Sequence, residues 1–211
     1  MIYSQKIREA IQFSIHTHEI VQHQKRKGKD IPYITHPLTV GLILARASTG
    51  EDTIVAGILH DTIEDSVSGH SVTIETLREC FGENVALLVD SVTESTKELP
   101  WQERKDAALA RVATFSHQSV LVKAADVISN DWELLEDYRV DGDSIFERFK
   151  VSKEQRLQHQ FQMIDALQLK WPESPLAKDL EDVATALNSI TRSGPGPKEL
   201  NPLSREGEGQ G

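Results

Sequence analysis

The chain has 211 residues, of which 38% are hydrophobic and 27% charged, which suits one well-buried core and excludes collagen, a coiled coil and full disorder. Its net charge of -10 opposes non-specific binding to nucleic acid or to an anionic membrane, because the average surface repels both. The single Cys80 excludes an internal disulfide, and no apolar run reaches the roughly 20 residues of a membrane span, so we expect a cytoplasmic protein.

Helices are predicted along residues 1–192, because apolar side chains recur at three- and four-residue spacing and strand-like alternation is not sustained. The first helix is expected over about 3–24, the second begins at His36-Pro37, and the third follows Gly50. Further helices are expected near 73–81, 83–94, 101–115, 118–137, 152–170 and 175–192, with Gly82, Pro100, Gly142 and Pro172 between them. The predicted fold is an all-α bundle of about eight to ten helices in one domain.

Residues 193–211 differ from the rest of the chain in composition. They hold eight of its twenty Gly and Pro residues and almost no apolar side chains beyond Leu200 and Leu203. We expect this segment to be a disordered tail.

Two segments carry clustered positive charge. Four cations fall within residues 25–29, which on charge alone is typical of a solvated turn, although an anion-binding patch has the same composition. The second segment, 100–105, places two cations close to Trp101 and is interpreted as an amphipathic surface helix rather than a flap that reaches a site.

Four ionisable side chains follow an apolar helix at His60, Asp61, Glu64 and Asp65. On a helix, Glu64 lies four residues after His60, and Asp65 lies four residues after Asp61, so these groups are expected on one face. Placing four ionisable groups together costs folding free energy unless they bind a ligand or act in a reaction.

A metal ion needs more ligands than one His-Asp pair, and the chain offers two more. His36 stands at the start of a predicted helix, and Asp126 follows the apolar run 120–125. A buried carboxylate requires a cation or hydrogen-bond donors. Alone, His36 fits a helix cap and Asp126 an exposed helical residue, but their joint occurrence favours a metal site.

With His36, His60-Asp61 and Asp126 in this order, the chain resembles the HD-domain metal-dependent phosphohydrolases. The segments PYITHPLTV, AGILHDTIEDS, FGENVALLVDSVTEST and LVKAADVISN are similar to the hydrolase domain of the RelA/SpoT family, over about 5–170. That family includes small stand-alone alarmone hydrolases, which remove pyrophosphate from the 3′ position of ppGpp. The resemblance implies that these four side chains bind one divalent ion, usually manganese, and the mixed nitrogen and oxygen ligands also suit iron or zinc.

The resemblance also implies roles for other residues. Glu64 and Asp65 are expected to orient the attacking water and accept its proton, although both could instead orient the ligand histidines. The nucleotide contacts that it implies are Arg26, Lys27, Tyr33, Asn130 and Arg156.

Two positions depart from the pattern of the family. Trp132 stands where the motif after Asp126 usually continues to an arginine, and Gln160 stands where an aromatic residue is expected. The predicted function is hydrolysis of a nucleotide polyphosphate, most specifically ppGpp, with another nucleotide or phosphoester as the alternative substrate. A catalytically silent nucleotide- or partner-binding module is the alternative from another class. No nucleic-acid or membrane partner is expected, and a homo-oligomer is compatible with the sequence.

Overall fold

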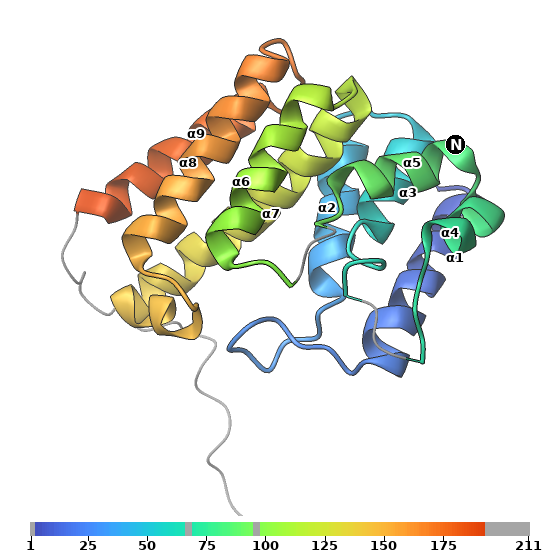
Figure 1. Ribbon diagram of the computed structural model, residues 1–211, viewed down its shortest axis with the longest axis horizontal. Coiled ribbons are helices and arrows are strands. Elements are labelled where there is room, and N and C mark those ends of the chain that lie inside the picture. The colour runs from blue at the N-terminus through green and yellow to red at the C-terminus, as the bar shows by residue number, and fades with distance from the viewer. Residues whose placement is uncertain (1–2, 66–68, 95–97, 193–211) are drawn as a thin grey trace, which may run out of the picture.

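The computed structural model describes residues 3–65, 69–94 and 98–192, and this part of the chain is built from helices (Figure 1). It contains nine α-helices: α1 (Gln5–Ile15), α2 (Thr35–Arg46), α3 (Glu51–Leu59), α4 (Ile74–Phe81), α5 (Glu83–Val92), α6 (Trp101–Arg111), α7 (His117–Asp141), α8 (Lys153–Lys170) and α9 (Ala177–Arg192). Shorter helical segments are η1 (His16–Val21), η2 (Val112–Thr114) and η3 (Gly142–Arg148). The described residues form no β-strand, and one isolated antiparallel bridge pairs Lys25 with Pro32. The all-α prediction is confirmed.

Two further expectations concern the tail and the membrane. The predicted disordered tail, 193–211, lies outside the described residues. Among the described helices, none combines the length and the apolar character that crossing a membrane requires.

Local signals explain where several helices begin and end. Serine side chains cap the first turns of α1, α7 and α8: Ser4, Ser116 and Ser152 each accept a hydrogen bond from a backbone N–H three residues later. Gly82 separates α4 from α5 with a φ of +89°, a conformation that glycine adopts without strain. Pro100 immediately precedes α6. These boundaries therefore follow from residues that the sequence displays.

The long helix α7 forms the centre of the core. In Figure 1 it lies between the pair α8 and α9 on one side and the group α2, α3 and α5 on the other, and it packs against all five. Its buried Val122 joins Leu44 of α2, Leu59 of α3 and Ile164 of α8 in one continuous apolar cluster. A residue on α7 is therefore held rigidly relative to both halves of the fold.

The predicted first helix differs in its second half. The regular helix α1 ends at Ile15, and residues His16–Val21 continue as a π-helix, whose wider turn holds one more residue than an α-helical turn. This change brings Thr17 and His18 into the interior, whereas Ile20 is exposed. The prediction of one regular helix missed this change, because apolar periodicity assumes a constant number of residues per turn.

The acidic motif after α3 also departs from the predicted helix. Helix α3 ends at Leu59, and residues 60–65 form turns. The Thr62 hydroxyl donates to the Leu59 carbonyl oxygen at 2.7 Å, and a side chain that occupies a backbone acceptor competes with continuation of the helix. Asp65 N still donates to Asp61 O at 2.9 Å, so part of the helical spacing survives.

Gly57 allows α3 to approach α2, and its substitution tests this packing. A Cβ atom at Gly57 would lie 2.3 Å from Leu44 Cδ1 and 3.2 Å from Val40 Cγ1. We expect Gly57→Ala to destabilise the fold by about 1–3 kcal/mol through overpacking, offset in part by about 1 kcal/mol of helix propensity. Thermal unfolding measures the change. Because Leu44→Val removes the clashing methyl group, the double variant should lose less than the sum of the single variants, and simple additivity would contradict this account.

Candidate active site

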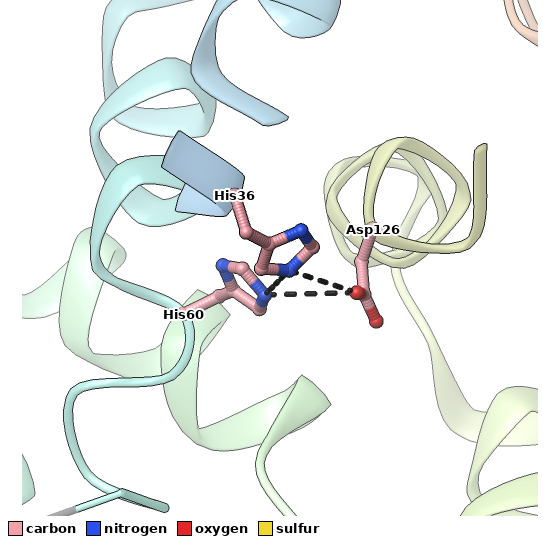
Figure 2. A group of neighbouring side chains, drawn as sticks. All are labelled: His36, His60 and Asp126. Carbon is pink, nitrogen blue, oxygen red and sulfur yellow. Dashed lines mark hydrogen bonds and ion pairs between the residues drawn. The ribbon is translucent and has the colours of Figure 1, made fainter. Parts of the chain in front are cut away.

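Three buried side chains from separate segments meet at one point (Figure 2). His36 lies in the first turn of α2, His60 directly follows α3, and Asp126 lies on α7. The Nε2 atoms of the two histidines are 3.2 Å apart. Asp126 Oδ1 lies 3.3 Å from His36 Nε2 and 3.7 Å from His60 Nε2. The three groups therefore offer their ligand atoms to one shared position.

Each imidazole is oriented through its Nδ1 atom. His60 Nδ1 donates to Gly57 O at 2.8 Å, and His36 Nδ1 lies 3.1 Å from Ser129 Oγ. Because a carbonyl oxygen only accepts, Nδ1 of His60 carries the hydrogen, and Nε2 of the neutral ring presents its lone pair. Outer hydrogen bonds of this kind are typical of histidines that bind metal ions.

Asp61 completes the set of predicted metal-binding residues. Its Oδ2 lies 3.1 Å from His60 Nε2 and 3.6 Å from His36 Nε2. The same oxygen accepts a hydrogen bond from the Tyr33 hydroxyl at 2.5 Å. The structure thus brings together all four side chains that the sequence singled out.

The carboxylates in this buried position need positive charge. Burial by itself lowers the pKa of His60, but Asp61 and Asp126 outweigh that effect and raise the pKa well above its usual value. Lys123 Nζ and Asn130 Nδ2 also donate to the two oxygens of Asp126, at 2.8 and 2.6 Å. A divalent cation would also neutralise the carboxylates, and two imidazoles with carboxylates suit Mn, Fe or Zn. The cluster is therefore suited to one divalent ion.

Glu64 and Asp65 lie on the turn beside this cluster. Glu64 Oε2 accepts a hydrogen bond from Glu94 N at 3.3 Å. Burial raises the pKa of Glu64 to about 7, with further contributions from the negative charges of Asp61 and Glu94. Asp65 Oδ2 accepts a hydrogen bond from Gln24 Nε2 at 2.9 Å. Both acids line one cavity, although they stand on a turn and not on the predicted helical face.

Sequence reasoning missed a polar chain behind Asp65. His18 Nδ1 lies 2.8 Å from Gln24 Oε1, and the amide nitrogen of the same Gln24 reaches Asp65. His18 is fully buried and reaches this position on the π-helix. No spacing rule reveals these contacts, because they depend on the widened turn.

The cluster opens into two adjoining cavities. The inner cavity, of about 150 Å³, is lined by Asp61 and Asp126. The outer cavity, of about 530 Å³, is lined by the basic segment 25–27 and by residues of α6, α7 and 148–151. Arg156 lines both. The described wall of the outer cavity carries eight Lys and Arg against five Asp and Glu, so it is locally cationic on a chain with a net charge of -10.

All five predicted substrate-binding residues line the outer cavity, namely Arg26, Lys27, Tyr33, Asn130 and Arg156. Two of them also hold carboxylates of the metal-binding cluster. Tyr33 donates to Asp61, and Asn130 donates to Asp126. These two residues therefore connect the cavity wall to the position of the ion.

The three predicted cations have different surroundings. Arg26 forms an ion pair with Glu133 at 2.5 Å. Lys27 Nζ and Arg156 Cζ instead lie 4.9 and 4.6 Å from the centroid of the Phe149 ring. Part of the cationic surface is thus neutralised by the protein, and part is not.

Helix α6 supplies a wall of the cavity that the sequence interpretation placed at the surface. No residue within α6 is fully buried, so it is a surface helix, but Trp101, Arg104 and Lys105 line the outer cavity. Arg104 Nη1 lies 3.3 Å from Glu94 Oε2, and Lys105 pairs with the other oxygen of Glu94. The segment is therefore a surface helix, as interpreted, and one of its faces also lines the cavity.

The two departures from the family pattern have structural counterparts. Gln160 is buried and donates from Nε2 to Asp131 Oδ1 at 2.5 Å, and burial raises the pKa of that carboxyl to about 7. Phe149 supplies an aromatic ring to the outer cavity from another segment. Trp132 is 37% exposed, while Arg148 adds a cation to the cavity wall.

Comparisons with known proteins agree with this geometry. A family model described as an HD domain matches residues 10–130, more than half of the chain. The guanosine-3′,5′-bis(diphosphate) 3′-pyrophosphohydrolase MESH1 of Danio rerio is 37% identical over 124 residues, which are 58% of this chain and 65% of that protein. A GTP pyrophosphokinase of Streptomyces coelicolor is 46% identical over 111 residues, 51% of this chain and 12% of that protein. The match thus spans less than two thirds of either relative.

A solved structure extends the similarity over more of the chain. It is that of a metazoan orthologue of SpoT that hydrolyses ppGpp and plays a role in starvation responses. The TM-score is 0.68 at 26% identity, and the alignment covers 86% of this chain and 94% of the other. The similarity therefore includes the helices that follow Asp126.

Ser129 provides a test of the ion site that leaves the proposed ligands intact. Ser129→Ala removes the partner of His36 Nδ1, and loss of such a partner typically weakens metal binding about 10–100-fold. Isothermal titration calorimetry with Mn²⁺ measures the affinity of the metal-free protein. The matched control is Ser144→Ala on η3, whose exposed hydroxyl donates to Asp141 O at the end of α7 and whose loss should leave binding unchanged. Equal affinities for the wild type and Ser129→Ala would show that Ser129 does not orient His36.

Buried Glu64 is expected to lower the stability of the metal-free protein above neutral pH. Its pKa is about 7 in the folded state against 4.5 normally, so the folded state binds this proton more tightly and loses stability as the pH rises between these values. We expect Glu64→Gln to raise the free energy of unfolding at pH 8 by up to about 3 kcal/mol, and by much less at pH 5. Urea unfolding at both pH values measures the gain, and an equal gain at the two pH values would contradict the assignment.

Proposed function

The chain belongs to the HD-domain family, and we propose that it is a metal-dependent phosphohydrolase that releases pyrophosphate from the 3′ position of guanosine 3′,5′-bis(diphosphate), ppGpp. The observation that carries this proposal is the meeting of His36, His60, Asp61 and Asp126 beside an acidic pair and a cationic cavity. The relative from Danio rerio is named for this reaction. Another nucleotide polyphosphate is the alternative substrate.

We propose that the two histidine Nε2 atoms and the carboxylates of Asp61 and Asp126 hold one divalent ion, with Mn²⁺ as the first choice and Fe²⁺ or Zn²⁺ as alternatives. Imidazole and carboxylate donors without a thiolate support this choice. A bound ion of this kind lowers the pKa of water and neutralises negative charge on the reacting phosphate. Tyr33 and Asn130 keep the two carboxylates in place through their hydrogen bonds.

Glu64 and Asp65 are proposed to orient the attacking water and to accept its proton. A carboxyl group with a pKa of about 7, such as Glu64, can both ionise and accept a proton near neutral pH. The alternative role, orientation of the ligand histidines, has less support because the Nδ1 atoms of those rings already bond to Gly57 and Ser129. Gln24 holds Asp65 in place through its hydrogen bond.

The cationic cavity explains how an acidic chain can bind a polyanionic nucleotide. Arg26, Lys27 and Arg156 are proposed to bind phosphate oxygens, because charge-assisted hydrogen bonds from such groups are strong. Like-charge repulsion by the rest of the surface then disfavours nucleic acids, which would contact a much larger area.

We further propose that residues 1–192 form one domain and that the protein acts in the cytoplasm. The packing of α7 against both α2 and α9 supports a single domain. The free Cys80 is compatible with a reducing compartment.

The protein loaded with Mn²⁺ is expected to release pyrophosphate from ppGpp, and Glu64→Gln is expected to lower kcat by about 100-fold or more without loss of bound metal. Pyrophosphate release and elemental analysis of the same samples measure the two quantities. The matched control is Glu75→Gln on the exposed part of α4, which should retain full activity.

Two outcomes would contradict the proposal in different ways. No turnover of ppGpp by the metal-loaded wild type would reject ppGpp as the substrate. If the wild type and Glu64→Gln are equally inert towards all nucleotide polyphosphates yet bind them alike, the protein is a binding module and not an enzyme.

A further inference from the structure

Three cations gather around one aromatic ring in the outer cavity. The distance from the Phe149 ring centroid is 4.6 Å to Arg156 Cζ, 4.9 Å to Lys27 Nζ and 5.9 Å to Arg148 Cζ. Lys150, the next residue after Phe149, lines the same cavity. These four cations, here called the Phe149 cluster, come from three segments: the loop before α2, the end of η3 and its following turn, and α8.

The Phe149 cluster is short of negative charge. Among the described residues, Arg148 is its one member with a carboxylate partner, Asp137 at 2.7 Å. The Nε atom of Arg156 is buried and has no hydrogen-bond partner in the described part of the chain. Burial, and then repulsion by the other three cations, lowers the pKa of Lys27. Among the described residues, none of Lys27, Lys150 and Arg156 forms an ion pair with a carboxylate, although the more distant negative charges of Asp131 and Asp126 act on Arg156.

Other cations of the basic loop have carboxylate partners, both Arg26 in the cavity wall and Lys29 outside it. Arg26 and Lys29 share Glu133, and Lys29 also pairs with Asp137 at 2.6 Å. Glu133 and Asp137 neutralise these two cations and hold the loop that carries them against α7. The charge excess of the cavity is therefore concentrated at the Phe149 cluster.

The Phe149 ring holds cations without neutralising them. A cation over an aromatic face is attracted by the ring quadrupole, which carries no net charge, so its positive charge remains available to an anion. A carboxylate in the same position would have competed with that anion. An aromatic ring in place of a carboxylate thus holds the cations together and leaves them able to bind an anion.

We propose that Lys27, Lys150 and Arg156 form a second anion subsite, which binds the diphosphate group of the substrate that is not cleaved. This inference rests on the proposed function, because ppGpp carries diphosphates at both the 3′ and the 5′ carbon of one ribose. Arg156 lines both the inner and the outer cavity, so an anion bound to it lies beside the compartment of Asp61 and Asp126. The 3′ group reaches that compartment, and the 5′ group binds to the Phe149 cluster.

The subsite predicts selection for substrates with two anionic groups. A contact to the uncleaved diphosphate is made equally before and during the reaction, so it lowers KM and leaves kcat largely unchanged. Nucleotides with a single phosphorylated position should therefore be poorer ligands through weaker binding.

Guanosine 5′-diphosphate carries the uncleaved diphosphate alone and therefore probes the subsite without turnover. We expect the double variant Lys27→Gln/Lys150→Gln, assayed by calorimetry with the Mn²⁺-loaded protein, to bind it about 10-fold more weakly or worse. The control Lys153→Gln/Lys178→Gln removes the same two charges from residues that pair with Asp143 and Asp182 and do not line the cavity, and it should bind normally. Equal binding by the wild type and the Lys27→Gln/Lys150→Gln variant would overturn the inference.

Steady-state kinetics supplies an independent measurement. The Lys27→Gln/Lys150→Gln variant should show a KM for ppGpp raised about 10-fold, with kcat unchanged. Its KM for guanosine 3′-diphosphate with a free 5′ hydroxyl should equal that of the wild type. An equal loss on both substrates would mean that the lysines do not recognise the 5′ group. Wild-type protein that hydrolyses neither substrate would refute the proposed function, while the calorimetric result would still decide the subsite.

Discussion

Two imidazoles and two carboxylates lie close together where three helical segments meet, and the negative charge of the two buried carboxylates requires a cation nearby. Without positive charge, Asp61 and Asp126 would repel each other in a buried position. The pKa of His60 is raised because a proton partly meets this demand. A divalent ion meets it better, since the Nε2 lone pairs already face the same point. Much of the surrounding hydrogen bonding serves to keep these four groups in position.

Helix α7 connects this cluster to the cavity. Ser129 and Asn130 follow Asp126 by three and four residues, Glu133 follows them by four and three, and Asp137 follows Glu133 by four, so these residues lie along one face of the helix. The first three residues hold or complete the ion site, whereas the last two pair with the basic loop. Because the apolar side chains of α7 are packed in the core, this polar stripe is held in place. One helix therefore sets the relative positions of the cluster that suits a metal ion and the basic loop that lines the cavity.

Much of the fold and the centre of the site could be predicted from the sequence. Apolar periodicity and short-range signals such as Ser152 and Gly82 act within a few residues, so they place helix boundaries without knowledge of the tertiary structure. His36 and Asp126 could be identified as ligands because histidines and carboxylates beside apolar helical runs need a partner. The order of these residues along the chain then indicated the family.

The tertiary structure alone decided which groups support the site. Ser129 contacts His36 across 93 residues, Gln24 reaches Asp65 across 41, and Phe149 gathers cations from three segments. It also decided that α3 ends at Leu59, where the Thr62 hydroxyl takes the acceptor of a further helical turn. The physical reason is the separation in sequence over which each signal acts. Periodicity records which side of an element is buried, whereas hydrogen bonds and charge balance depend on which elements meet, and only the packed chain determines that.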